Sequence, residues 1–70
     1  MERTNIDTRL IKSMGYDKEK KIMEVEFSSD MIYQYNNFPE DLYNEIVENK
    51  NIDKFFKLNV VNRYHYNRLK

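Results

Sequence analysis

Basic and aromatic side chains are interleaved in the last third of the chain, and together they could contact a nucleic acid. Seven candidate residues fall in this stretch: Lys50, Lys54, Lys57, Arg63, Tyr64, Tyr66 and Arg68. Lysine and arginine neutralise phosphates, and each such contact steepens the salt dependence of binding. Tyrosine rings stack on unpaired bases, and each stack contributes about 1–3 kcal/mol. The set predicts an RNA-binding surface, and the alternative is an ordinary solvated helix face.

Tyr33 and Tyr35 are a second candidate pair for base stacking. They flank Gln34 in an extended segment, so both rings lie on one face of the expected strand. Aromatic rings on a sheet surface stack on the bases of single-stranded RNA. Met31 lies on the same face, however, and the alternative is that all three side chains pack beneath a helix. Both interpretations remain open at this point.

No residue pattern predicts catalysis, a metal ion or a cofactor. His65 is the only histidine and there is no cysteine, so no metal-ligand spacing is present. Gly15 is the only glycine, which excludes a glycine-rich phosphate loop. Glu24 and Glu26 alternate with apolar residues and are best explained as an exposed strand face. We expect a binding module without catalytic residues, metal ligands or cofactors.

Leu58 and Val61 form a candidate protein interface. They lie three residues apart and off the apolar face expected for the last helix, so part of their surface should stay exposed. Exposed apolar patches usually mark interfaces, and a homodimer would offset the small core of a short chain. A larger protein is the other possible partner. The alternative is a helix that the C-terminal tail covers on this side.

Length and composition are those of one small domain. The chain has 70 residues with 12 basic and 12 acidic side chains, so its net charge is zero. No stretch is long and apolar enough to span a membrane, and the absence of cysteine fits a reducing compartment, the cytoplasm. Residues 1–49 nevertheless carry a net charge of −5, and residues 50–70 one of +5. An anionic partner would explain this asymmetry, as would attraction between the two halves.

Three segments with the character of strands must position these residues. Residues 10–16 mix apolar and small side chains, whereas residues 22–27 and 31–36 alternate with a period of two. Short polar turns separate the three segments, as in an antiparallel meander. Residues 1–9 are polar and aperiodic, and we expect them to be a lead-in arm.

Two helices are expected to follow the meander. Pro39 suits the first position of a helix over residues 39–49, with Glu40 and Asp41 in its first turn. Asn51 is a plausible cap for a second helix, whose apolar face continues to Tyr64. Residues 65–70 would then be a basic tail. The expected fold is α+β, one domain over residues 1–70 in which a three-stranded antiparallel meander precedes two helices packed on one sheet face.

Six short motifs, in matching order and spacing, resemble the KTSC domain family over about residues 8–69. They are Ser13-Met14-Gly15-Tyr16-Asp17, Glu24-Val25-Glu26-Phe27, Tyr33-Gln34-Tyr35, Phe38-Pro39-Glu40, Phe55-Phe56 and Arg63-Tyr64-His65-Tyr66. The resemblance implies a small domain that stands alone in bacteria and phages and occurs at the C-terminus of some lysyl-tRNA synthetases. This second context implies RNA binding. The family has no established enzyme activity.

Three functions are compatible with the sequence. The first is RNA binding through the basic, tyrosine-rich C-terminal helix face, together with the two strand tyrosines. The second is a protein interaction or self-association through Leu58 and Val61. The third is binding of a small nucleotide or ligand on a tyrosine-lined surface. One contiguous positive face formed by residues 50–70 would favour the first, whereas pairing of these cations with acidic side chains of the first helix would weaken it.

Overall fold

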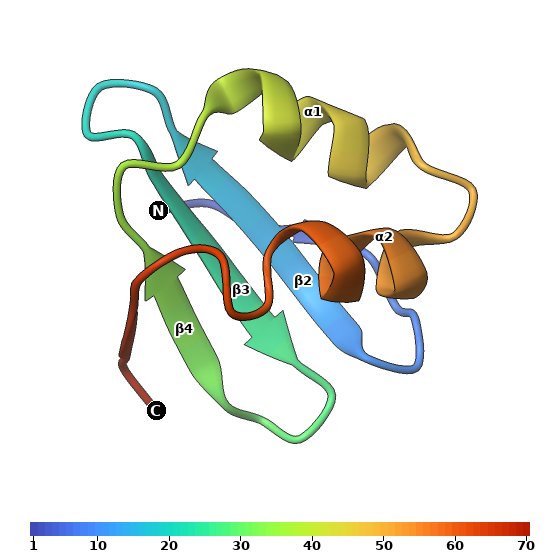
Figure 1. Cartoon of the computed structure of the whole chain (residues 1–70). Helices are drawn as coiled ribbons and strands as arrows, with labels where there is room; N and C mark the ends of the chain where they lie inside the picture. Colours follow the sequence, from blue (N-terminus) through green and yellow to red (C-terminus); the bar gives the residue numbers. More distant parts are fainter.

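The computed structural model describes all 70 residues, which form five strands and two helices (Figure 1). The strands are β1 (Thr4–Asn5), β2 (Ile11–Asp17), β3 (Ile22–Phe27), β4 (Ile32–Tyr35) and β5 (Tyr66–Arg68). They form one antiparallel sheet in the order β1-β2-β3-β4-β5. Helices α1 (Glu40–Glu48) and α2 (Ile52–Asn59) both cover the same face of the sheet (Figure 1). The α+β class and the placement of the helices agree with the expectation.

The expectation of a three-stranded sheet is wrong, because each end of the chain adds an edge strand. Thr4 and Asn5, within the expected lead-in arm, pair with β2. Tyr66–Arg68, within the expected basic tail, pairs with β4. Neither segment shows apolar alternation, so periodicity could not reveal it. Backbone hydrogen bonds, which any residue except proline can donate, hold these two strands in the sheet.

The hydrophobic core lies between the sheet and the helices. As the alternation of residues 22–27 predicts, Met23, Val25 and Phe27 belong to this core. Phe27 and Tyr35 both meet Phe56 of α2 edge to face, with ring centroids 5.9 and 6.0 Å apart. Ten hydrophobic residues are buried: Ile11, Met14, Met23, Val25, Phe27, Tyr35, Phe38, Ile46, Phe56 and Val60.

The first helix begins one residue later than expected. Pro39 has an extended backbone, with ψ at 136°, and therefore precedes α1 instead of occupying its first helical position. Glu40 and Asp41 lie in the first turn, as expected, where their negative charge suits the helix dipole. Neither α1 nor α2 has the length and apolar character that a bilayer-spanning helix requires.

The second helix has the expected cap but ends before Tyr64. The Asn51 side chain accepts a hydrogen bond from the Lys54 backbone N–H at 3.3 Å, which caps the N-terminus. The helix ends at Asn59, and Asn62 then adopts a positive φ of 65°. Asparagine tolerates this left-handed conformation better than most residues. Tyr64 is therefore positioned by a turn, and the expectation of one continuous helical face is wrong.

A polar network covers part of the helix-free face of the sheet. Arg3 forms an ion pair with Glu24, and its Nη2 atom lies 3.8 Å from Oε1 of Glu26. Gln34 donates a hydrogen bond to Glu24 at 2.8 Å, and the Ser13 hydroxyl donates one to Glu26 at 3.0 Å. Glu24 is buried, so the interpretation of this acidic pair as an exposed strand face is wrong for Glu24. Its charge is compensated by Arg3, from the segment expected to be an unpaired arm.

Gly15 lies where the N-terminal segment crosses this face. A Cβ at this position would overlap the main-chain carbonyl oxygen of Glu2 and approach Arg3 Cγ at 3.2 Å. Gly15→Ala should therefore lower the free energy of unfolding by about 1–3 kcal/mol, because the backbone at Glu2, which precedes β1, or the Arg3 ion pair must shift. Thermal and urea denaturation would measure this loss. Lys12→Ala is the matched control at an exposed position of the same strand, and an equal loss in both variants would contradict the prediction.

Candidate functional site

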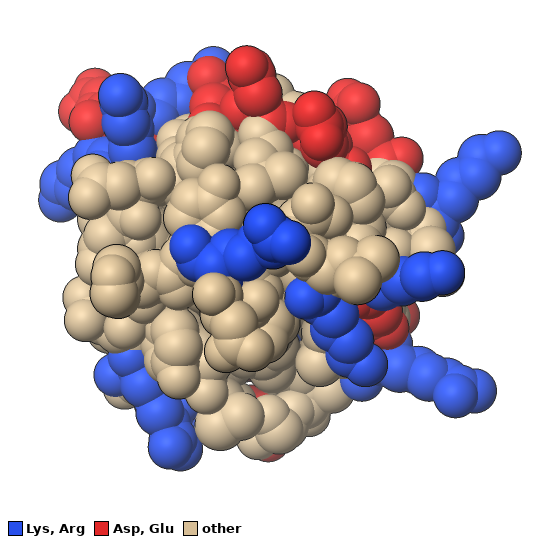
Figure 2. Space-filling view, in the orientation of Figure 1, with Lys and Arg blue, Asp and Glu red and all other residues tan.

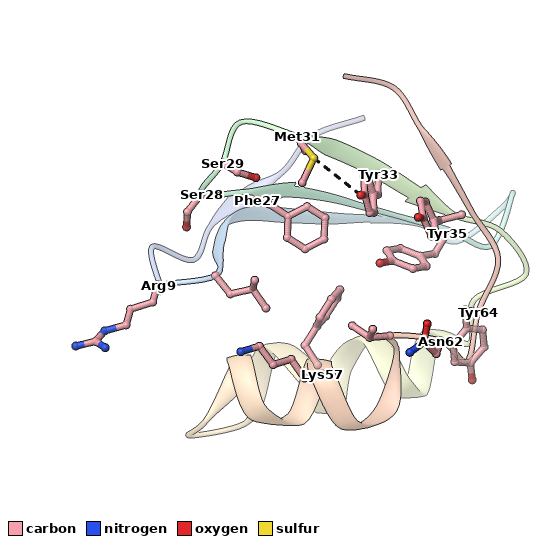
Figure 3. Close-up of a pocket in the computed structure, with 14 residues that line it drawn as sticks. Arg9, Phe27, Ser28, Ser29, Met31, Tyr33, Tyr35, Lys57, Asn62 and Tyr64 are labelled. Atoms are coloured by element: carbon pink, nitrogen blue, oxygen red, sulfur yellow. Dashed lines mark hydrogen bonds between the residues drawn. The ribbon is translucent and has the colours of Figure 1, made fainter.

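A groove opens between α2 and the edge of the sheet formed by β3, β4 and β5 (Figure 3). Its volume is about 740 Å³, within the range of about 300–1,000 Å³ typical of ligand pockets. Nine of its 14 lining residues are hydrophobic, and six of these are aromatic. The six rings belong to Phe27, Tyr33, Tyr35, Phe56, Tyr64 and Tyr66. We call this site the aromatic groove.

The sheet side of the groove is set by the register of β4 and β5. Tyr35 lies opposite Tyr66, and Tyr33 lies opposite Arg68, so all three tyrosines are on the helix-facing side. The Tyr66 ring stacks on Tyr33 with a centroid distance of 4.3 Å and an interplanar angle of 9°. Tyr66 is 51% exposed. The stack therefore presents an accessible aromatic surface to a ligand.

Tyr33 and Tyr35 combine the two interpretations left open by the sequence. Tyr35 is only 3% exposed and belongs to the core, whereas Tyr33 is half-buried and packs against the core. Both nevertheless line the groove. Because the cavity borders the core on this side, a side chain can pack against Phe56 and still meet a ligand.

The helix side of the groove comes from α2 and the turn that follows it. Phe56 and Lys57 belong to α2, and Asn62 and Tyr64 follow its end. Figure 3 shows Lys57 across the space from Phe27 and the strand tyrosines. The positive φ of Asn62 redirects the chain after the helix. The Tyr64 ring then packs on the Phe38 ring, with a centroid distance of 4.8 Å.

Two cations and no acidic side chain line the groove. Arg9 and Lys57 lie towards the same end in Figure 3, with Arg9 extended outward. Neither forms an ion pair, since the cations that do are Arg3, Lys12 and Lys18. The charge at the mouth of the groove therefore favours an anionic ligand.

Five of the nine residues predicted to contact nucleic acid converge on the groove: Tyr33, Tyr35, Lys57, Tyr64 and Tyr66. Four others do not line it. Lys50 lies between the helices and Lys54 near the start of α2, both exposed. The Arg63 Nε donates to the Leu58 carbonyl at 3.0 Å and so satisfies the end of α2. Arg68 lies on β5 opposite Tyr33.

The cations of residues 50–70 are free of ion pairs, yet they do not form one continuous positive face. None of them pairs with an acidic side chain of α1. Figure 2 shows acidic side chains gathered along the border over α1, several basic side chains close together at the right of the view, and other basic side chains separated from these by uncharged surface. In this view the charge asymmetry of the sequence therefore does not produce one continuous positive face.

Some residues of the groove carried no functional signal in the sequence. Arg9 lies in the aperiodic segment that looked like an arm, and Asn62 follows the end of α2. Phe27 and Phe56 were recognisable only as core residues by their spacing. Their position beside a cavity follows from where α2 ends, which local patterns do not specify.

The two residues predicted as an interface, Leu58 and Val61, are 60% and 43% exposed. Val61 lines the groove and Leu58 does not. Their use as an interface stays a prediction. No group of three or more His, Cys, Asp or Glu side chains is arranged to hold a metal ion.

Comparison with known proteins places this architecture in a family. The model of the KTSC domain matches residues 7–64. The chain belongs to the KTSC domain family. An uncharacterized protein of Stutzerimonas stutzeri is 33% identical over 66 residues, which cover 94% of this chain and 92% of that protein. The family resemblance inferred from the six motifs is confirmed.

The KTSC fold is also seen in a solved relative. The crystal structure of a KTSC domain protein from Yersinia pestis is similar with a TM-score of 0.94 at 22% identity, covering 99% of this chain and 97% of that one. At this identity the likeness establishes the fold. Every residue that lines the aromatic groove except Tyr66 lies within the matched KTSC segment. The groove is thus largely built from the KTSC domain itself.

The raised pKa values of two tyrosines predict that this KTSC domain loses stability at alkaline pH. Burial raises the pKa of Tyr35, with the nearby Tyr33 and Tyr66 phenols adding to the effect, and burial also raises the pKa of Tyr43. The unfolded chain releases these protons near pH 10, before the folded chain does. The free energy of unfolding should be unaffected by these groups below about pH 10 and should fall as the pH rises further. Urea denaturation between pH 8 and 11 would measure this fall, which should be smaller in Tyr35→Phe than in the wild type. If the free energy of unfolding depends on pH identically in the two proteins, the prediction is contradicted.

Proposed function

We propose that this KTSC domain is a non-enzymatic module that binds single-stranded RNA in the aromatic groove. The observation that carries the proposal is the lining of the groove, with six aromatic rings, two cations and no acidic side chain. A nucleotide combines a planar ring with an anion, and the groove offers a complementary group for each. A purely apolar ligand would use the aromatic rings and leave the two cations without a role.

The shape of the groove favours an unpaired base. A base could enter between the sheet and α2 and pack on the exposed Tyr33–Tyr66 stack, with its phosphate at the end near Arg9 and Lys57. The bases of a duplex are stacked and paired, so they cannot enter in this way. Single-stranded RNA is therefore the expected form of the ligand.

The distribution of charge predicts that the affinity for RNA depends only weakly on salt concentration. Only Arg9 and Lys57 line the groove, and the other lysines and arginines of the chain lie outside its lining. Two phosphate contacts to a single strand give a slope of log K against log salt of about −1.4. Affinity for RNA would then come mainly from base stacking, with a smaller contribution from charge.

The chemistry of the lining supports binding without catalysis. Histidine, aspartate and glutamate, the side chains that most often act as general acids and bases, are absent from the groove, and so is cysteine. Burial also holds the Tyr35 phenol in its neutral form by raising its pKa. The polar groups on the rim, Ser28, Ser29 and Asn62, suit hydrogen bonding to a ligand.

Exchange of a single lysine tests this proposal. Lys57→Ala should weaken binding of a labelled single-stranded RNA several-fold and reduce the magnitude of the salt slope by about 0.7, because one phosphate contact is lost. Lys50→Ala is the matched control, since Lys50 is also exposed and unpaired but does not line the groove. Fluorescence anisotropy at several salt concentrations would measure both. Equal losses of affinity in the two variants would count against the groove as the RNA-binding site. So would an affinity of the wild type for duplex RNA equal to that for single-stranded RNA.

A second candidate function is self-association through the apolar surface around Leu58. This side chain is 60% exposed and does not line the groove, so RNA binding leaves it without a role. We expect sedimentation of the wild type to show a concentration-dependent increase in mass that Leu58→Ser abolishes, because burial of Leu58 would drive the contact. Leu69→Ser is the control at another exposed leucine, which is 55% exposed. A strict monomer at high concentration would exclude this candidate.

A further inference from the structure

Tyr35 is a buried residue whose side-chain hydroxyl has no hydrogen-bond partner within the chain. Three buried residues have a polar side-chain atom: Ser13, Glu24 and Tyr35. The Ser13 hydroxyl donates to Glu26, and Glu24 accepts from Arg3 and Gln34. Tyr35 is 3% exposed, and its hydroxyl takes part in none of the side-chain hydrogen bonds of the structure. Polar groups of buried residues are normally satisfied by the protein or by water, so this hydroxyl is free to bond to a partner from outside the chain.

The hydroxyl of Tyr35 is not sealed inside the core. No fully enclosed side-chain nitrogen or oxygen in the structure lacks a hydrogen-bond partner, so the small accessible part of Tyr35 includes its hydroxyl. Tyr35 lines the aromatic groove, and Figure 3 shows it between the sheet and α2. The free space that the hydroxyl meets is therefore the interior of the groove.

We propose that the Tyr35 hydroxyl is a hydrogen-bonding subsite that selects a nucleobase inside the aromatic groove. This inference rests on the proposed function and names the group that distinguishes a base from an apolar ring. A phenol both donates and accepts hydrogen bonds, so it can meet a ring nitrogen, a carbonyl oxygen or an amino group at the edge of a base. An aromatic hydrocarbon has no such atom and would leave the hydroxyl unpaired.

The rings around Tyr35 are arranged to orient such a base. The centroids of the Tyr66 and Phe56 rings lie 5.7 and 6.0 Å from that of Tyr35, and that of Tyr33 lies 6.4 Å away. A base that packs on these rings brings its edge towards the hydroxyl, and Arg9 and Lys57 then face its phosphate. The neighbouring Tyr33 hydroxyl contacts Met31 Sδ at 3.9 Å and does not compete for Tyr35.

Removal of one oxygen atom tests the subsite. The probes are the four ribonucleoside 5′-monophosphates, with ribose 5-phosphate as a baseless control, titrated into the isotope-labelled full chain and followed by NMR. In the wild type, at least one nucleotide should shift the resonances of residues around the groove at concentrations where ribose 5-phosphate does not. Tyr35→Phe should weaken nucleotide binding about tenfold and leave ribose 5-phosphate unchanged.

A stability measurement separates this role from a structural one. Tyr35→Phe removes an unpartnered hydroxyl and keeps the ring, so its melting temperature at neutral pH should equal or exceed that of the wild type. Tyr43→Phe is the matched control, because Tyr43 is also partly buried and its hydroxyl forms no side-chain hydrogen bond, but it lies outside the groove, so the nucleotide affinity of this variant should stay within about twofold of the wild type. A lower melting temperature for Tyr35→Phe would show a structural role for the hydroxyl and overturn the inference.

The outcomes distinguish the subsite from RNA binding as such. If single-stranded RNA binds the wild type and Tyr35→Phe equally, the proposed function stands and the Tyr35 subsite is overturned. If mononucleotides bind in a Tyr35-dependent manner but RNA strands do not bind, the subsite stands and the proposed function is overturned. If neither mononucleotides nor RNA bind the wild type, both are overturned.

Discussion

The packing of Phe56 on the sheet is the interaction on which the rest of the structure depends. Helix α2 has eight residues, too few for independent stability in water, so tertiary contacts must hold it. Phe56 supplies them by meeting Phe27 and Tyr35 edge to face, while Val60 is buried beside it. Because α2 ends at Asn59, the rings of β4 and β5 beyond it stay partly uncovered. The aromatic groove is the direct consequence of a short helix on a wider sheet.

The two ends of the chain complete this arrangement through backbone pairing. Strand β5 places Tyr66 on Tyr33 and so provides the accessible ring of the groove, although β5 itself has only three residues. Strand β1 brings Arg3 to Glu24 on the opposite face, where the ion pair compensates a buried carboxylate. The sheet therefore has an aromatic face that packs and binds, and a polar face whose charges satisfy each other.

Family membership and local chemistry contribute different parts of the functional argument. The KTSC relatives establish the fold, and the relative from Stutzerimonas stutzeri is itself uncharacterized. The proposal of RNA binding is supported instead by the lining of one groove and by a hydroxyl without a partner. The opposite charges of the two halves of the chain matter less than they first suggested, because they neither pair with one another nor merge into one positive face (Figure 2).

The sequence by itself determined the α+β class, the strands at residues 22–27 and 31–36, the cap at Asn51 and the family. These follow from alternation, capping and motif spacing, which are local properties of the chain. The tertiary structure alone decided that β1 and β5 join the sheet, since their pairing depends on backbone groups common to most sequences. It also decided that Arg9 reaches the groove, that Lys50 does not, and that the Tyr35 hydroxyl opens into free space. These positions depend on strand register and on where α2 ends, which are settled only when the whole core packs.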